Sequence, residues 1–400
     1  MEYLIEYVKW RGDLSLKNDK FNVIDIMILT QISYLNFEKI VSSDFKESIT
    51  LNQLWNIFKS ESDFKKRSDL GMLLNKKTVN LLEEAALSDR FKDVKVLGYV
   101  NKVDVTAEEQ FSAVTYCLGK SLKNPIIIFR GTDDTIVGWK EDFNMAFLEK
   151  VPAQIDSVEY LKKVSKSIRG KITIAGHSKG GNLAIYSASY INSICKNRIS
   201  DIYNFDGPGF SQKVVNSIGY KLISSKIKAI YPQKSVVGMF FQIPREFLVI
   251  KSDNDGIWQH DMMSWKVLGK QMITVSKLDS SSIYFNKVFN SWYSNLKPEQ
   301  IKKVVDTFFD ILELTGASTN SELKSDILTN SKKIIKALSS VDKSVHSEIK
   351  KMFNLFLESI FVPTTPNSIN AAAISKQSSF SAMLKTKISI ALTTDKIILK

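Results

Sequence analysis

The chain has 400 residues, of which 44% are hydrophobic and 24% are charged. This composition excludes disorder over most of the length and allows a large core in two or three domains. The formal net charge is +13, but the excess lysine is spread along the chain without an Arg-rich cluster. A solvated basic surface is the simpler explanation, and attraction to an anionic membrane or polyanionic substrate is the alternative. No motif predicts nucleic-acid binding.

The cysteines and the N-terminal residues indicate the cellular compartment in which the protein is expected. The two cysteines, Cys117 and Cys195, lack the CxxC spacing of a zinc or redox site, so we expect no metal, no cofactor and no disulfide framework. The first residues include Glu2 and Glu6 and do not resemble a signal peptide. No apolar run approaches the roughly 18 residues that span a bilayer. These features favour a cytoplasmic protein and leave its oligomeric state open.

Residues 1–90 have the apolar periodicity of helices and carry no motif with obvious chemistry. From residue 94 the period changes to that of strands alternating with helices. The expected strands are 94–103, 110–116, 126–129, 172–174, 202–205, 227–231 and 247–250, with helices near 139–148, 158–168 and 214–218. The second strand is the expected hairpin partner of the first, and the apolar run 126–129 should be buried on both faces.

Alternation of strands and helices predicts a doubly wound, mostly parallel sheet. Functional sites in such sheets lie beyond the C-terminal ends of the strands. Thr132, Ser178, Asp206 and His260 all follow expected strand ends. The sequence therefore predicts one site at this edge of the sheet.

A helical pattern resumes at Pro298 and Glu299, a pair typical of a helix start. Further on, apolar residues advance by threes and fours along one helical face, which favours packing against neighbouring helices over a membrane or partner surface. They are Ile334, Leu338, Val341, Val345, Ile349, Met352, Phe356 and Ile360. The pattern breaks at residues 364–368, and the tail after it has no assigned structure.

The most informative stretch is residues 171–186, K-I-T-I-A-G-H-S-K-G-G-N-L-A-I-Y. It places G-x-S-x-G between an expected strand and an expected helix, where the central Ser178 would occupy a strained turn with its hydroxyl exposed above the sheet. Glycine is needed at Gly176 and Gly180 because a Cβ there would collide with a neighbouring element. The alternative is a glycine-rich turn in which Ser178 is an ordinary helix N-cap.

A serine nucleophile needs a general base, and the chain has three histidines. His177 adjoins Ser178 and should point away from its hydroxyl, whereas His346 lies in the C-terminal region. His260 follows the last central strand, which is the expected place for the base. The oxyanion donors should be the backbone N–H of Lys179 and Thr132, the latter through its N–H or hydroxyl, although Thr132 has a possible second role in capping the next helix.

The acid that orients the base is left open. The candidates between the serine and the base are Asp201, Asp206, Asp253 and Asp255. Asp206 ends a strand next to the serine strand, whereas Asp253 and Asp255 are close to His260 in sequence. Each of them is also a common turn residue.

Three segments resemble class 3 lipases: F-R-G-T at residues 129–132, the G-H-S-K-G-G-N-L-A segment at 176–184, and F-D-G-P-G at 205–209. A closer resemblance is to the bacterial Mbeg1-like proteins and covers about residues 1–290. It rests on W-R-G-D at 10–13, F-N-V-I-D at 21–25, S-Y-L at 33–35, Q-F-S-A-V at 110–114, S-V-V-G-M at 235–239 and Q-H-D at 259–261. This resemblance implies an α/β-hydrolase-like fold and hydrolytic activity on an unspecified substrate.

Carried onto this sequence, the resemblance implies Ser178 as nucleophile, His260 as base, and Thr132 and Lys179 as oxyanion donors. Class 3 lipases place their catalytic Asp after the strand that ends here at Tyr231, where this sequence has Ser235. The acid is therefore either moved, with Asp206 as the favoured position, or missing.

We therefore expect a serine hydrolase of esterase or lipase type that cleaves an acyl ester or lipid through an acyl-enzyme. The expected fold is an α/β-hydrolase-like, mostly parallel sheet with helices on both faces. Residues 1–90 would form its helical N-terminal part, 91–296 its core, and 297–400 a C-terminal helical region. The alternative is a weak or inactive scaffold whose C-terminal helices bind a partner or an anionic membrane peripherally.

Overall fold

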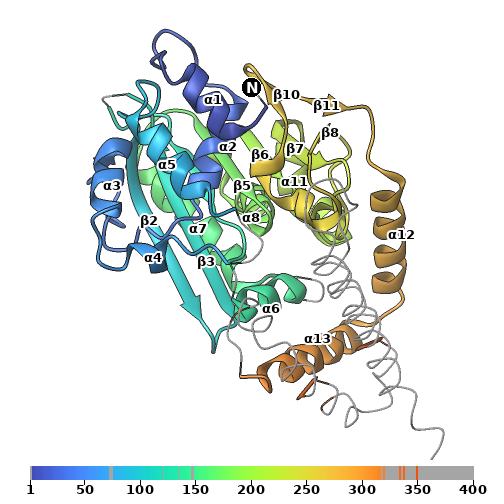
Figure 1. Cartoon of the computed structure of the whole chain (residues 1–400). Helices are drawn as coiled ribbons and strands as arrows, with labels where there is room; N and C mark the ends of the chain where they lie inside the picture. The colour runs from blue at the N-terminus through green and yellow to red at the C-terminus, as the bar shows by residue number, and fades with distance from the viewer. Residues whose placement is uncertain are drawn as a thin grey trace, which may run out of the picture.

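A computed structural model of the chain describes residues 2–316 apart from 72–74, 120, 134 and 146–147, and beyond these only residues 319, 333–334, 337 and 348–349. In this part of the chain a nine-stranded sheet forms the centre of the fold (Figure 1). The strands lie in the order β1-β2-β3-β4-β5-β6-β7-β8-β11. Their bounds are β1 Ile49–Thr50, β2 Lys95–Asp104, β3 Glu109–Cys117, β4 Ile126–Phe129, β5 Ile172–His177, β6 Ile199–Phe205, β7 Ile227–Pro232, β8 Phe247–Ile250 and β11 Thr274–Val275.

The five central strands, β4 to β8, are parallel, as the sequence predicts. Both margins are antiparallel: β1, β2, β3 and β4 pair in this way on one side, and β11 pairs with β8 on the other. The predicted hairpin of β2 and β3 is confirmed. The links between β2, β3 and β4 are too short for the crossover of a dozen or more residues that parallel pairing requires.

Helices cover both faces of this sheet, which confirms the α/β-hydrolase-like fold class. The helices are α1 Leu4–Arg11, α2 Val23–Ile32, α3 Leu51–Phe58, α4 Phe64–Arg67, α5 Thr78–Leu87, α6 Ile136–Asn144, α7 Pro152–Ser167, α8 Lys179–Tyr190, α9 Ser193–Lys196, α10 Gln212–Val215, α11 Ile218–Ile223, α12 Ser280–Ser294 and α13 Pro298–Glu313. Four short 3₁₀ helices also occur among the described residues: η1 Ser224–Lys226, η2 Val237–Met239, η3 Gly256–His260 and η4 Met262–Ser264. A small two-stranded sheet joins β9 Val267–Leu268 to β10 Gln271–Met272.

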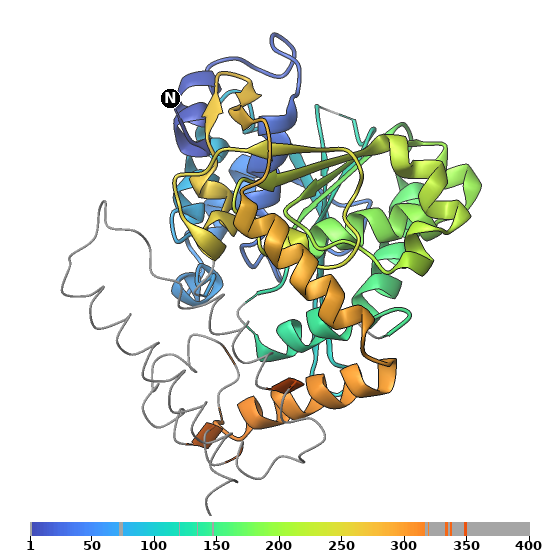
Figure 2. The same cartoon turned by 90° about the vertical axis from the view of Figure 1, so that its right-hand side faces the viewer.

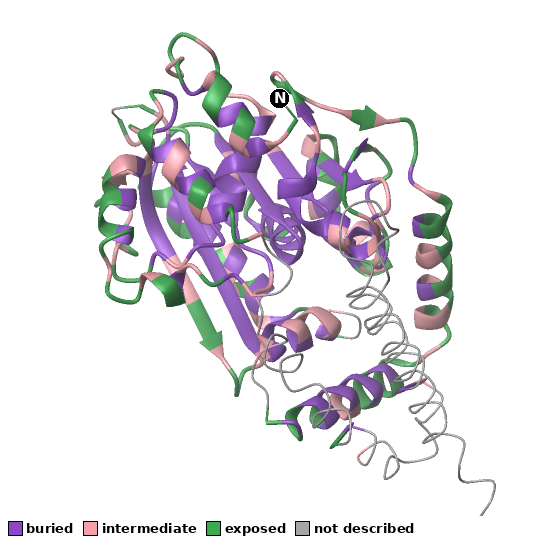
Figure 3. Ribbon diagram, viewed as in Figure 1, coloured by how far each residue is buried: buried purple, intermediate pink, exposed green. Residues whose placement is uncertain are grey.

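Alternate residues of each central strand pack into separate cores, because successive side chains point to opposite faces. In β4, Ile126 and Ile128 join a core with α1, α2 and α5, whereas Ile127 and Phe129 join a second core with α7, α8 and α11. All four side chains are buried, which confirms the prediction for this strand (Figure 3). The sheet is thus held between two apolar layers.

The helices α6, α12 and α13 lie beside the sheet (Figure 2). Their buried side chains contribute to a third apolar cluster. Pro298 is the first residue of α13, as the sequence predicts. Ile334 and Ile349, from the predicted apolar stripe, are buried in this cluster. The other stripe residues lie outside the part of the chain that the structure describes.

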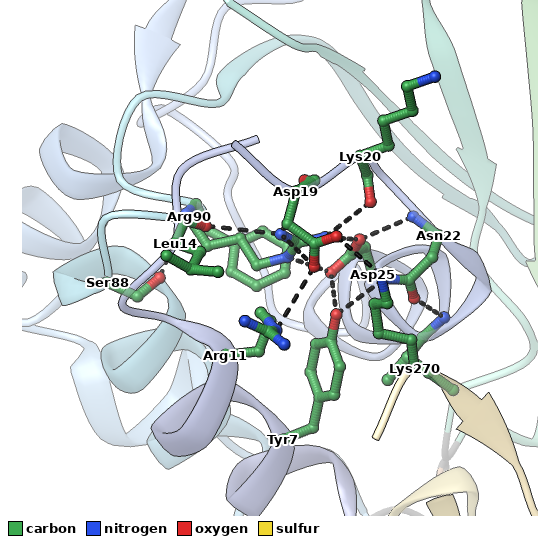
Figure 4. Close-up of polar contacts among 12 residues, drawn as sticks. Tyr7, Arg11, Leu14, Asp19, Lys20, Asn22, Asp25, Ser88, Arg90 and Lys270 are labelled. Atoms are coloured by element: carbon green, nitrogen blue, oxygen red, sulfur yellow. Dashed lines mark hydrogen bonds and ion pairs between the residues drawn. The ribbon is translucent and has the colours of Figure 1, made fainter. Parts of the chain in front are cut away.

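A buried ion pair joins the N-terminal helices to the segment before β2 (Figure 4). The Arg90 guanidinium donates from Nε to Oδ1 of Asp25 at 2.7 Å and from Nη2 to Oδ2 at 2.5 Å. Tyr7 donates its hydroxyl to the same carboxylate, and Arg90 also reaches the backbone carbonyl of Asp19. Asn22 caps α2 in a reciprocal capping box with Asp25. The F-N-V-I-D segment thus has a structural explanation.

Replacing Arg90 with Met should therefore destabilise the fold. The change leaves the Asp25 carboxylate buried without its partner, which costs about 3–5 kcal/mol in the free energy of unfolding. Lys92→Met is a matched control, because Lys92 pairs with Asp89 at the surface and such exposed pairs contribute little to stability. Urea unfolding of both variants measures the difference. Equal losses would contradict the role given to the buried pair.

Candidate functional site

Ser178 lies in a strained turn between β5 and α8. Its backbone has φ 58° and ψ −134°, a region that costs a non-glycine residue on the order of 1–3 kcal/mol. Among the described residues, its side chain makes no capping hydrogen bond with α8. The alternative explanation of Ser178 as an ordinary N-cap is therefore contradicted, and the predicted strained turn is confirmed.

Close backbone approaches explain the glycines around this turn. A Cβ on Gly176 would lie 2.1 Å from the carbonyl oxygen of Gly180, and one on Gly180 would lie 2.0 Å from that of Phe129 at the end of β4. The predicted collisions are confirmed. A Cβ on Gly131 would lie 2.8 Å from the Cβ of Ser178, so the loop after β4 passes directly against the serine.

Asp206 and His260 meet at the same edge of the sheet as Ser178. Asp206 directly follows β6, the neighbour of β5, and His260 ends η3. Nδ1 of His260 lies 2.6 Å from Oδ2 of Asp206, and both side chains are buried. This contact fixes one ring nitrogen of His260 and leaves Nε2 as the nitrogen able to exchange a proton with a substrate or nucleophile.

The other acids considered from the sequence pair elsewhere. Asp201, Asp253 and Asp255 form ion pairs with Lys228, Lys266 and Lys234, at N–O distances of 2.6, 2.6 and 2.5 Å. Asp253 also accepts the hydroxyl of Tyr3. Asp206 is thus the candidate that the structure brings to His260.

Ser235, which follows β7, contacts Asp206. Its hydroxyl donates to Oδ1 of Asp206 at 2.5 Å, and its side chain is buried. A Cβ on Gly238 would lie 2.5 Å from the same oxygen, which explains a glycine in the S-V-V-G-M segment. From the sequence, Ser235 leaves the acid either moved or missing; in the structure its hydroxyl orients the Asp206 carboxylate, which follows the neighbouring strand β6.

Lys179 directs its ammonium group into the protein. Nζ donates to Oε2 of Glu141 at 2.9 Å, and to the carbonyl and side-chain oxygens of Gln110 at 2.7 and 2.8 Å. Glu141 in turn accepts the backbone N–H groups of Gln110 and Ala153. The buried pair ties the start of α8 to β3 and α6. The sequence analysis does not predict this pair.

The hydroxyl of Thr132 is already engaged. It donates to Oδ2 of Asp142 at 2.5 Å, so the backbone N–H of Thr132 is the remaining donor at this residue. The predicted cap of the following helix comes instead from Thr135, which accepts the N–H of Gly138.

His177 is fully buried and contacts both Tyr34 and the His260 segment. Its Nδ1 lies 2.7 Å from the Tyr34 hydroxyl, and its Nε2 lies 2.7 Å from the carbonyl oxygen of His260. The sequence predicts only that this side chain turns away from the serine. His346 lies outside the described residues.

Within the residues that the structure describes, no group of three or more His, Cys, Asp or Glu side chains is arranged to hold a metal ion. In the same part of the chain, no helix combines the length and apolar character needed to cross a bilayer.

Comparison with known proteins adds a remote structural likeness and a family. A solved structure described as "Crystal structure of M37 lipase" has 15% sequence identity and a TM-score of 0.34, over 54% of this chain and 68% of that chain. A search of curated proteins finds no match. The family model for Mbeg1-like proteins matches residues 85–310, which is more than half of the 400 residues and includes every residue assigned above to the candidate site except Tyr34. The chain belongs to the Mbeg1-like family.

Proposed function

We propose that the protein is a serine hydrolase that cleaves an acyl ester, with Ser178 as nucleophile, His260 as base and Asp206 as the orienting acid. The observation that carries the proposal is the 2.6 Å contact between Asp206 and His260 at the strand edge where Ser178 holds its strained turn. A strained serine, a histidine and a buried carboxylate in this arrangement support nucleophilic catalysis.

The proposed reaction follows from the protonation states. Because the Asp206 carboxylate accepts a hydrogen bond, Nδ1 of His260 carries a proton and Nε2 is free to accept another. Nε2 takes the hydroxyl proton of Ser178 as its oxygen attacks the ester carbonyl, and the imidazolium then protonates the leaving alcohol. Water then attacks the acyl-serine while Nε2 accepts its proton. The proton passes on to the Ser178 oxygen, which releases the carboxylic acid product and restores the serine.

The oxyanion would be held by backbone donors. Lys179 begins α8, so its N–H belongs to the unpaired first turn of a helix and lies at the positive end of the helix dipole. The N–H of Thr132 is the second proposed donor, because Gly131 brings this loop against the serine. The Thr132 hydroxyl is excluded from this role while it donates to Asp142.

The protonation state of Asp142 determines how this carboxyl group bonds Thr132 in the loop after β4. Burial raises the pKa of Asp142 to about 6, against the opposing effects of the Lys179 charge and the Thr132 hydrogen bond. About a quarter of its side chain is exposed, but the Oδ1 atom of the carboxylate is buried. Above pH 6 the ionised carboxylate accepts the Thr132 hydroxyl and holds the loop in the observed arrangement.

The substrate class rests on the resemblance of residues 129–132 and 176–184 to class 3 lipases. It supports an ester with an acyl chain and does not distinguish a lipid from a soluble ester. A panel of p-nitrophenyl esters of increasing chain length therefore serves as the first assay.

Ser178→Ala should remove turnover of these esters. Loss of a triad nucleophile lowers kcat by at least about 10³-fold, and the melting temperature should be preserved because the side chain makes no capping bond. Ser189→Ala is a matched control within α8, because it removes a buried hydroxyl that donates to the carbonyl of Ile185. Turnover by Ser178→Ala within tenfold of wild type would contradict the proposal. A folded wild type inactive on every ester would favour the scaffold alternative.

Asp206→Asn should lower kcat strongly while leaving the fold intact. The amide can donate to Nδ1 and so favour the wrong tautomer of His260, a change that lowers kcat by about 10²- to 10⁴-fold in triads of this kind. Asp253→Asn is the control, because that carboxylate is partly exposed and paired with Lys266 and should change kcat by about threefold or less. Similar kcat losses in the two variants would contradict the assignment of the acid.

The stability of Asp142→Asn should depend on pH in a predictable direction. A raised folded-state pKa means that the folded protein binds more protons than the unfolded chain between about pH 4 and 6, so wild type loses the associated stability as pH rises through 6. The variant lacks this loss. Its unfolding free energy relative to wild type should therefore increase from pH 4.5 to pH 7.5 in urea titrations. A decrease over this interval would contradict the raised pKa.

A further inference from the structure

His177 bridges the serine turn and the segment that carries the proposed base. Its ring lies 4.3 Å from the ring of His260, centroid to centroid. Neither ring nitrogen of His177 is directed at Asp206: Nδ1 meets the Tyr34 hydroxyl and Nε2 meets the backbone of His260, each at 2.7 Å. The residue before the nucleophile thus holds the main chain of the base rather than its side chain.

Hydrogen-bond chemistry fixes the tautomer of this ring. A carbonyl oxygen can only accept, so Nε2 of His177 must carry the proton that faces His260. In the neutral ring Nδ1 then accepts, and the Tyr34 hydroxyl is its donor. A Cβ on Gly131 would lie 2.2 Å from the Tyr34 oxygen, so the same hydroxyl also fills the space beneath the oxyanion loop.

The ring should stay neutral throughout the reaction. Burial, followed by the neighbouring charge of His260, lowers the pKa of His177 well below its usual value. The titratable groups that face it are Tyr34 and His260, and burial raises the pKa of Tyr34. When His260 becomes an imidazolium, it therefore meets no second positive charge across the ring contact.

A second donor fixes the adjacent carbonyl. Nε1 of Trp265 donates to the carbonyl oxygen of Gln259 at 2.6 Å, and the side chain of Gln259 accepts the backbone N–H of Lys234. Consecutive carbonyls of the base segment are thus held by side chains from outside η3. This arrangement gives the Q-H-D segment a role in placing His260.

We propose that His177 is a positioning residue, which donates its Nε2 proton to the carbonyl of His260, accepts the Tyr34 hydroxyl at Nδ1, and so places the base between Asp206 and Ser178. The inference rests on the proposed hydrolase function. It adds to that function a requirement for a neutral donor at residue 177, and it extends the site to a tyrosine that follows α2 in the N-terminal helices.

The first test compares two substitutions at residue 177 by ester hydrolysis. His177→Leu removes the donor, and a misplacement of the base by about 1 Å lowers kcat on the order of 100-fold, with KM changed by threefold or less. His177→Gln keeps an N–H group at the distance of Nε2 and should recover at least a tenth of the wild-type kcat. Equal kcat losses in both variants, or a loss that follows the melting temperature alone, would overturn the proposal.

The second test needs no activity and no substitution at residue 177. In wild-type protein labelled with ¹⁵N-histidine, the three imidazoles are assigned with His260→Gln and His346→Gln. We expect His177 to stay neutral with its proton on Nε2 from pH 5.5 to 8. Titration in this range, or a proton on Nδ1, would overturn the proposal. This result does not depend on turnover. If the wild type is inactive, the hydrolase function is contradicted, but the NMR result still tests the tautomer and hydrogen bonds of His177.

Discussion

The fold around the candidate site depends on how closely three backbone segments approach one another at the serine turn. Side chains at Gly176 and Gly180 would place a Cβ about 2 Å from carbonyl oxygens, one of them at the end of β4. This packing holds Ser178 in its strained conformation, and the buried pair of Lys179 and Glu141 fixes the first residue of α8 against it. These contacts hold the backbone of the turn in place without help from any ligand.

The same edge of the sheet holds the Asp206 carboxylate between two partners. The carboxylate at the end of β6 uses one oxygen for His260 and the other for Ser235, which follows β7. Ser235 is thus part of the candidate site, as a hydrogen-bond donor to the carboxylate. The proposed acid thus follows β6, and the proposed base lies in the segment after β8.

The parallel centre of the sheet and the strained serine were predictable because they follow from local patterns, a buried apolar run and glycines beside Ser178. The antiparallel pairing of β11 with β8 was not predictable, because a strand of two residues is too short to show the alternation of apolar and polar residues. The choice among four aspartates depended on contacts across 54 residues of sequence, between Asp206 and His260. The pair of Lys179 with Glu141 and the contact of Tyr34 with His177 are similarly long-range, and composition or spacing contains no sign of them.

The most direct measurement is to map the adduct that a fluorophosphonate forms with the purified full-length protein. An activated serine reacts with such a phosphorus centre as it would with an ester carbonyl, and peptide mass spectrometry locates the modified residue. The account predicts a single adduct on Ser178 that forms slowly or not at all in His260→Ala. No adduct on the folded wild type, or one on another serine, would contradict it.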